Sequence, residues 1–422
     1  MKNKKKNEKS VCFKTRFSPT ALFFLCTAAQ LLFSILYLIS TGGNALLSIM
    51  PAQGADQFMD FFNHISYVRE PGGVYFASPH ACFPPLIYGM YGLFCRMLPQ
   101  DATVMYDPFG TSTHALLLYV VYCVLLAVCF FYSVCRMLKN RTMEFSLAAT
   151  VAVLLSYVFI FGVTERGNSV MIVCILLLLA LELRDSGNVV HRELALLFIA
   201  IAAGIKIYPA VFGVLYLFEK RWKEAGRLLL YGIGCFFVPF AWFGGSAGMK
   251  QFFLNQRFVH GLDVARLGSV KMSWEKVAVL LRDHFAVQTD LSWVGTLLTV
   301  AFAVFLLLGV FFCKDRFRKI LLLCGMMVVI PFWSGGYTFI YMCIPLIVFF
   351  RDAAEKKAGM DSYFYAGMFA LLFSFFIYDR PLCGYLFGTN IAMAQAALAV
   401  YVMCTAAAVR AIFGWICERF KK

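Results

Sequence analysis

Charged side chains are scarce in this sequence: Asp, Glu, Lys and Arg make up 14% of its 422 residues, whereas 61% of the residues are hydrophobic. Soluble domains are about one quarter charged and roughly one half apolar. A chain with so little charge cannot hide its apolar surface in one core surrounded by water. The composition therefore excludes an ordinary soluble domain and indicates a protein embedded in a lipid bilayer.

The sequence also lacks paired cysteines. It contains 15 Cys, but no Cys-x-x-Cys pair, and nearly all of them lie in apolar stretches, where Cys behaves as a small hydrophobic residue. Neither a zinc site nor a disulfide framework is indicated. No internal repeat is visible, and the only biased segment is a Lys-rich tail over residues 1–19.

Long apolar runs are what the sequence does contain. A helix needs about 20 apolar residues to cross a hydrocarbon layer of ~30 Å, and hydrocarbon offers no partner to an unpaired backbone amide. We therefore predict an all-α fold, a transmembrane helix bundle of about ten crossings that forms a single domain over residues 20–422. The predicted spans are residues 20–41, 114–138, 144–163, 168–184, 228–244, 292–313, 319–333, 337–350, 362–378 and 390–413.

Two further apolar blocks do not fit as simple crossings. Block 194–218 is too short for two full spans, and Lys206, Tyr208 and Pro209 interrupt it. It predicts a re-entrant helical hairpin, since broken backbone survives in a membrane only where protein or water covers it. Block 83–98 begins with Phe83-Pro84-Pro85 and predicts an interfacial or re-entrant helix, whose start suits Pro because the first turn of a helix needs no N–H there.

The net charge of +15 is distributed unevenly. When the chain is threaded through the apolar blocks, 27 of its 38 Lys and Arg lie on the side of the amino terminus. This positive-inside bias places both termini in the cytoplasm and explains the basic excess without a nucleic-acid partner. We expect a multi-pass protein of the bacterial cytoplasmic membrane, with long outer loops at about 42–113 and 245–291.

The first outer loop contains Asp56, Asp60 and His64 at four-residue spacing, which places them on one face of a helix. A carboxylate there is suited to act as a general base toward an acceptor hydroxyl. The aromatic residues Phe58, Phe61 and Phe62 are expected to rest on the bilayer surface beside this acidic face. The alternative is a solvated interfacial helix with two ordinary acids.

Two cations stand out near or within the apolar blocks. Arg166, beside Glu165 and Asn168, is suited to bind a phosphate, or else to pair with Glu165 or reach lipid headgroups. Lys206 is costly within a membrane, by about 2.5–3.5 kcal/mol. It therefore faces an anion such as a lipid phosphate or a carboxylate, or else caps carbonyls freed by Pro209.

The second outer loop contains amides and cations beside aromatic residues, a composition typical of a sugar or phosphate pocket and also of a mixed surface loop. We select Asn255, Gln256 and His260 as candidate substrate contacts, and Arg257 and Arg266 as candidate phosphate contacts.

The order of these motifs resembles glycosyltransferase family 87, the mannosyltransferases of the membrane-embedded C-type fold that use polyprenol-phosphate mannose. The resemblance runs over roughly residues 20–350. It is carried by Asp60-Phe61, Phe83-Pro84-Pro85-Leu86, Gly167-Asn168, Lys206-Ile207-Tyr208-Pro209 before Arg221-Trp222, and Asn255-Gln256.

The resemblance implies that Asp60 is the catalytic base and that Phe83-Pro84-Pro85 begins the helix beside the active site. The chain departs from the family pattern at Ser334-Gly335-Gly336-Tyr337, where relatives often have a His. The function of that His is either absent here or supplied from elsewhere, for instance by His64, His80 or His260.

The predicted reaction moves a hexose, mannose by resemblance, from a polyprenyl-phosphate donor to a glycolipid or glycan acceptor on the outer face. Direct displacement would invert the anomeric centre. Lys206, Arg166 and Tyr208 would bind the donor phosphate, while Asp56, His64, Pro84, Pro85 and Asn168 would line the substrate site. The scheme needs no cofactor, although binding of a divalent ion by Asp56 and Asp60 is left as an alternative. The rival functions are a flippase or transporter and a polymerase of lipid-linked saccharides.

Overall fold

The structure is a computed structural model that describes residues 17–44, 58–70, 72–102, 112–260, 273–287, 289, 291–331, 335–353, 359–375, 385–386 and 389–420. These residues are almost entirely helical, as the sequence predicts. The single strand pair among them is a two-residue antiparallel ladder between β1 (Tyr385–Leu386) and β2 (Thr389–Asn390).

The α-helices are α1 (Pro19–Ser40), α2 (Met59–Arg69), α3 (Val74–Ala77), α4 (Pro85–Arg96), α5 (Thr113–Met137), α6 (Met143–Leu154), α7 (Tyr157–Phe159), α8 (Val170–Leu183), α9 (Val189–Ile205), α10 (Gly213–Phe218), α11 (Trp222–Phe237), α12 (Gly245–His260), α13 (Trp274–His284), α14 (Ser292–Phe312), α15 (Arg316–Val329), α16 (Cys343–Asp352), α17 (Met360–Leu372) and α19 (Ile391–Arg419). Shorter helical turns are η2 (Ile160–Glu165), η3 (Tyr208–Phe212), η4 (Val238–Trp242) and η5 (Gly336–Met342).

Five described helical segments are long and apolar enough to cross a membrane: Pro19–Ser40, Thr113–Met137, Trp222–Trp242, Trp293–Phe312 and Ala392–Arg419. Their outward faces are apolar too. On α1, for example, Leu32 and Leu36 are each 58% exposed and Ile39 is 70% exposed. Soluble proteins rarely expose contiguous apolar surface of this extent, so these faces fit contact with lipid. The molecule is a helical membrane protein.

A sixth candidate span is bent. Helix α6 and the segment Tyr157–Glu165 meet at an angle of 58°. The break lies at Ser156, whose hydroxyl accepts a hydrogen bond from the backbone N–H of Phe159 and so caps the second segment. The second segment continues as the π-helical turn η2, which ends immediately before Arg166. As a result of the bend, Arg166 lies directly after a wide, π-helical turn.

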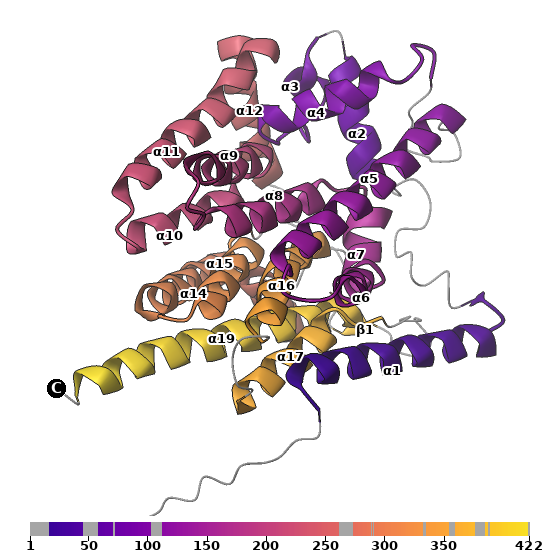
Figure 1. Cartoon of the computed structure of the whole chain (residues 1–422). Helices are drawn as coiled ribbons and strands as arrows, with labels where there is room; N and C mark the ends of the chain where they lie inside the picture. The colour runs from indigo at the N-terminus through magenta and orange to yellow at the C-terminus, as the bar shows by residue number, and fades with distance from the viewer. Residues whose placement is uncertain are drawn as a thin grey trace, which may run out of the picture.

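The second half of the chain contains the most densely buried helices. Every residue of α15 from Ile320 to Val329 is buried, as is every residue of α16 from Cys343 to Phe350. Small residues let the neighbouring helices approach closely: a Cβ added at Gly309 would lie 2.8 Å from Cβ of Ala408. Helices α14, α15 and α19 pack together here, and Figure 1 shows α1, α17 and α19 along the lower edge of the view.

At the opposite end of the view, the short helices α2, α3, α4 and α12 gather beside α9 and α11 (Figure 1). Pro85 occupies the first turn of α4, as predicted for this helix. One face of α4 is buried through Ile87, Tyr88 and Tyr91, whereas Leu93 on its other side is exposed. The fold therefore places the residues of the first predicted loop against α9, the helix that ends directly before Lys206.

Candidate active site

Asp60 lies in the first turn of α2, and the backbone docks this turn against the chain that follows η2. The N–H of Phe58 donates to the carbonyl of Glu165 at 2.6 Å, and the N–H of Asp60 donates to the carbonyl of Arg166 at 2.9 Å. Gly167 makes the approach possible. Its φ is +68°, and a Cβ there would lie 2.8 Å from Cβ of Phe61. Segments more than 100 residues apart in sequence are thus joined through main-chain contacts.

The Asp60 carboxylate is bound at both of its oxygens. Arg166 donates from Nη2 to Oδ1 at 3.0 Å, and Asn168 donates from Nδ2 to Oδ2 at 2.5 Å. Asn168 is oriented in turn, because its Oδ1 accepts from the N–H of Val170 at 3.1 Å. The Asp60 and Arg166 side chains remain 19% and 22% exposed, so the pair is partly accessible.

The surroundings of Asp60 keep it ionised. Burial acts to raise its pKa, but the Arg166 guanidinium and the hydrogen bond from Asn168 outweigh burial, with further help from Lys206, so the pKa is lowered from its ordinary value. A negative charge is therefore maintained at this position across the physiological pH range.

Lys206 supplies the second cation of the site. Helix α9 ends at Ile205, directly before this residue, and the chain resumes as η3 at Tyr208, so the predicted interruption is confirmed. The ammonium lies 3.3 Å from the ring centroid of Phe83 and 5.9 Å from that of Tyr337, a cation–π arrangement. Within the described part of the chain, no hydrogen bond joins this ammonium to a carbonyl, and its charge acts on Asp60. The geometry therefore favours the interpretation that Lys206 faces an anion.

His64 lies one helical turn after Asp60, buried among Phe83, Tyr88 and Tyr91, with ring centroids 4.8 to 5.4 Å away. Burial, with a smaller contribution from Lys206, outweighs the attraction of Asp60 and lowers the pKa of His64 to about 3. Its Nδ1 has no hydrogen-bond partner among the residues that the structure describes. His64 is therefore a neutral imidazole that does not compete with Asp60 for protons near neutral pH.

The prediction that Phe58, Phe61 and Phe62 rest on the bilayer surface is wrong. Phe61 and Phe62 are completely buried inside the protein, and Phe58 packs on Tyr119 with ring centroids 4.8 Å apart. Phe61 also contacts Tyr122, with ring centroids 4.9 Å apart. An apolar helix face has the same pattern whether its partner is lipid or protein, so sequence alone did not separate the two.

Asn255 and Gln256 bind the protein backbone in this structure. Asn255 is buried and donates from Nδ2 to the carbonyls of Tyr75 at 2.8 Å and Ala81 at 3.0 Å. Gln256 donates from Nε2 to the carbonyl of Cys82. In place of the predicted substrate contact, these amides hold the loop that leads into Phe83 and act as positioning groups.

The remaining predicted residues are scattered. Pro84 and Pro85 are buried at the start of α4, and Tyr208 is half-buried next to Lys206 in η3. Arg257 and His260 are exposed on α12, and His80 is exposed with its ring 5.8 Å from that of Phe258. Asp56 and Arg266 lie outside the described residues. Within the described ranges, no three His, Cys, Asp or Glu side chains are grouped as metal ligands.

Two aromatic residues of the site were not selected from the sequence as site residues. Phe83 supports the Lys206 ammonium, and Tyr337 is brought to the same place by a close backbone contact. A Cβ added at Gly162 in η2 would lie 2.6 Å from the Cα of Tyr337. The available signals were the aromatic residue before two prolines and the Gly335-Gly336 pair before Tyr337.

Comparison with known proteins bears on this site. Neither the curated proteins nor the solved structures yielded a match. The model of glycosyltransferase family 87 matches residues 99–331, which include Arg166, Asn168 and Lys206 but not Asp60. Since the match covers more than half of the chain, and since the cations that it contains converge on an ionised acid in a membrane helix bundle, the chain belongs to glycosyltransferase family 87.

Proposed function

We propose that this membrane glycosyltransferase moves a hexose, mannose in the first instance, from a polyprenyl-phosphate donor to a hydroxyl of a glycolipid or glycan acceptor. The observation that carries the proposal is the convergence of one carboxylate, Asp60, with two cations, Arg166 and Lys206, from three separate segments of the chain. Family membership supports the transferase reaction in general, and the charge arrangement supports a phosphate leaving group.

Asp60 is proposed as the general base. The carboxylate oxygens accept from Arg166 and Asn168, and each oxygen has a further lone pair for an acceptor hydroxyl. The acceptor oxygen would attack C1 of the sugar while its proton passes to Asp60, and the bond from C1 to the phosphate oxygen would break. A single displacement inverts the anomeric centre, so a β-linked donor gives an α-linked product.

Lys206 and Arg166 are proposed to stabilise the departing phosphate, where negative charge develops in the transition state. The Lys206 ammonium lies on the Phe83 face without a hydrogen-bonded anion among the described residues, so it is available to a phosphate oxygen. Arg166 donates from Nη2 to Asp60, and a planar guanidinium is the side-chain group whose geometry matches a phosphate. The donor needs no protein-bound metal in this scheme.

The proposal also includes the orientation of the chain in the membrane. We place both termini in the cytoplasm and the Asp60 site on the opposite side of a bacterial cytoplasmic membrane, from the positive-inside distribution of Lys and Arg. The ten crossings and the re-entrant hairpin around Lys206 belong to this arrangement. The interruption of α9 at Lys206 supports the hairpin, because the broken backbone lies against the protein.

The deciding experiment incubates membranes that contain the chain with polyprenyl phosphates bearing labelled mannose, glucose or arabinose. Transfer from the mannose donor with an α-linked product is the expected result. Membranes without the chain serve as the control. Transfer of a different sugar would correct the donor, and transport of the intact lipid-linked sugar without transfer would refute the enzymatic proposal.

A further inference from the structure

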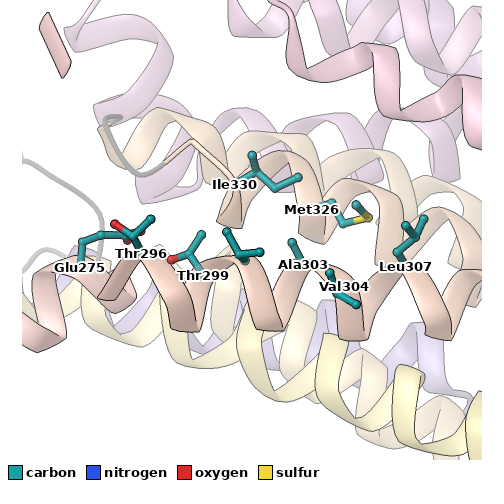
Figure 2. Close-up of a pocket in the computed structure, with 9 residues that line it drawn as sticks. Glu275, Thr296, Thr299, Ala303, Val304, Leu307, Met326 and Ile330 are labelled. Atoms are coloured by element: carbon teal, nitrogen blue, oxygen red, sulfur yellow. The ribbon is translucent and has the colours of Figure 1, made fainter. Parts of the chain in front are cut away.

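A second site lies apart from Asp60, in a cavity of about 300 Å³ between α13, α14 and α15. Neither Asp60 nor either of its cations lines it. Figure 2 shows its long wall, a stripe of α14 side chains that faces Met326 of α15 and Ile330, which directly follows that helix. The α14 stripe runs from Thr296 through Thr299, Val300, Ala303 and Val304 to Leu307. This stripe covers roughly 16 Å of helix at 1.5 Å per residue.

The groove is apolar over most of its length and polar at one end. Glu275 of α13 lies at that end next to Thr296 and Thr299 (Figure 2). The close contact of α13 with α14 holds it there, because a Cβ added at Gly295 would lie 2.4 Å from the Cα of Glu275. Both the carboxylate and the groove are therefore parts of one packed unit.

The polar end has unmet hydrogen-bonding capacity. Glu275 is more than nine-tenths buried, and neither of its carboxylate oxygens has a hydrogen-bond partner within the described part of the chain. The hydroxyl of Thr299, which is also buried, has none among the described residues either. A buried carboxylate without a partner is unfavourable, so this arrangement favours a donor in addition to the residues that the structure describes.

Charge and shape together define the class of ligand. A carboxylate repels a phosphate that has no cation beside it, which disfavours the lipid-phosphate head of the proposed sugar donor at this end of the groove. A primary ammonium fits, because it carries the opposite charge and three N–H donors, enough for both Glu275 oxygens and the Thr299 hydroxyl. An apolar wall along α14, one of the candidate membrane spans, fits a hydrocarbon chain.

We propose that the groove between α14 and α15 binds one chain of an aminophospholipid whose ammonium head group is held by Glu275. The site is a specific lipid site, separate from the transfer reaction at Asp60. Its selectivity comes from the N–H donors of the head group, since a choline head group has the same charge but no donor.

The test uses the full-length chain, purified in detergent and stripped of lipid. Native mass spectrometry measures the binding of phosphatidylethanolamine, phosphatidylcholine and phosphatidylglycerol with identical acyl chains. Phosphatidylethanolamine is expected to bind about tenfold more tightly than phosphatidylcholine, because only its head group makes charge-assisted hydrogen bonds. Equal binding of these two lipids, or preference for phosphatidylglycerol, would overturn the proposal without any variant.

Two variants test whether the lipid preference depends on Glu275 and on the groove. E275Q should bring the ratio of phosphatidylethanolamine to phosphatidylcholine binding close to one. A303F should fill the groove and reduce the binding of both lipids, whereas A301F, an exposed position of the same helix, is the matched control and should change nothing. A preference that survives both E275Q and A303F would place the lipid elsewhere and refute this assignment.

Discussion

Replacement of Asp60 by asparagine tests the centre of the proposed site, and its cost follows from the local hydrogen bonds. The new side chain would still offer an oxygen to Arg166, but its amide nitrogen would face the Nδ2 donor of Asn168, now 2.5 Å from Oδ2 of Asp60. The side-chain amide of Asn168 cannot flip to present its oxygen instead, because its Oδ1 already accepts a hydrogen bond from the N–H of Val170 at 3.1 Å. Two donors would therefore oppose each other.

We expect D60N to lower the free energy of unfolding by about 1–3 kcal/mol, the cost of an unsatisfied polar group with partial exposure. Transfer activity should fall by about 10²–10⁴-fold, the usual contribution of general base catalysis. The assay is transfer of label from polyprenyl-phosphate mannose in membranes, normalised to the amount of folded protein that detergent extracts.

The double variant D60N/N168D separates stability from catalysis. It restores a complementary amide and carboxylate, and the carboxylate introduced at position 168 can still accept from the N–H of Val170. Thermal stability should recover, while activity should stay low because the acid has moved. Full activity of folded D60N, or recovery of activity in the double variant, would refute the role of Asp60 as base.

The remaining predictions concern the neighbours of Asp60. K206M should weaken donor use by about 10- to 100-fold through loss of a charge-assisted contact, whereas K250M, an exposed lysine on α12, is the control; unchanged donor dependence would exclude Lys206 from the donor site. G167A should destabilise the protein by about 1–3 kcal/mol because φ is +68° there, and a thermal melt compared with that of G187A, where a Cβ meets open space, checks this. His64 is held neutral, with a pKa of about 3 in the folded protein against 6.5 in the unfolded chain. The free energy of unfolding is therefore fully retained above pH 6.5 and decreases as the pH falls from 6.5 toward 3. The loss amounts to roughly 2 kcal/mol by pH 5, so H64Q should flatten the fall of the melting temperature between pH 7.5 and pH 5, and an unchanged slope would contradict the buried neutral imidazole.

The tertiary structure changes the interpretation of some motifs more than others. Asp60, Arg166, Asn168 and Lys206 were selected from the sequence as acids, amides and cations close to apolar blocks, and the structure brings all four together. Asn255 was selected for the same reason, yet its amide is engaged by the backbone of the loop before Phe83. A polar side chain in an outer loop has the same sequence pattern in both roles.

Sequence alone determined the properties that depend on local composition: a helical membrane protein, the long apolar spans at α1, α5, α14 and α19, and the interruption of α9 at Lys206. These follow from hydropathy and from the cost of charge and proline within a helix. Only the tertiary structure decided which distant segments meet. The contact of Asp60 with Arg166 joins residues 106 positions apart, and it depends on a close approach at Gly167 that no local pattern encodes. Packing likewise decided that Phe61 is buried in protein, because lipid and protein interiors are equally apolar and a helix face is the same toward either.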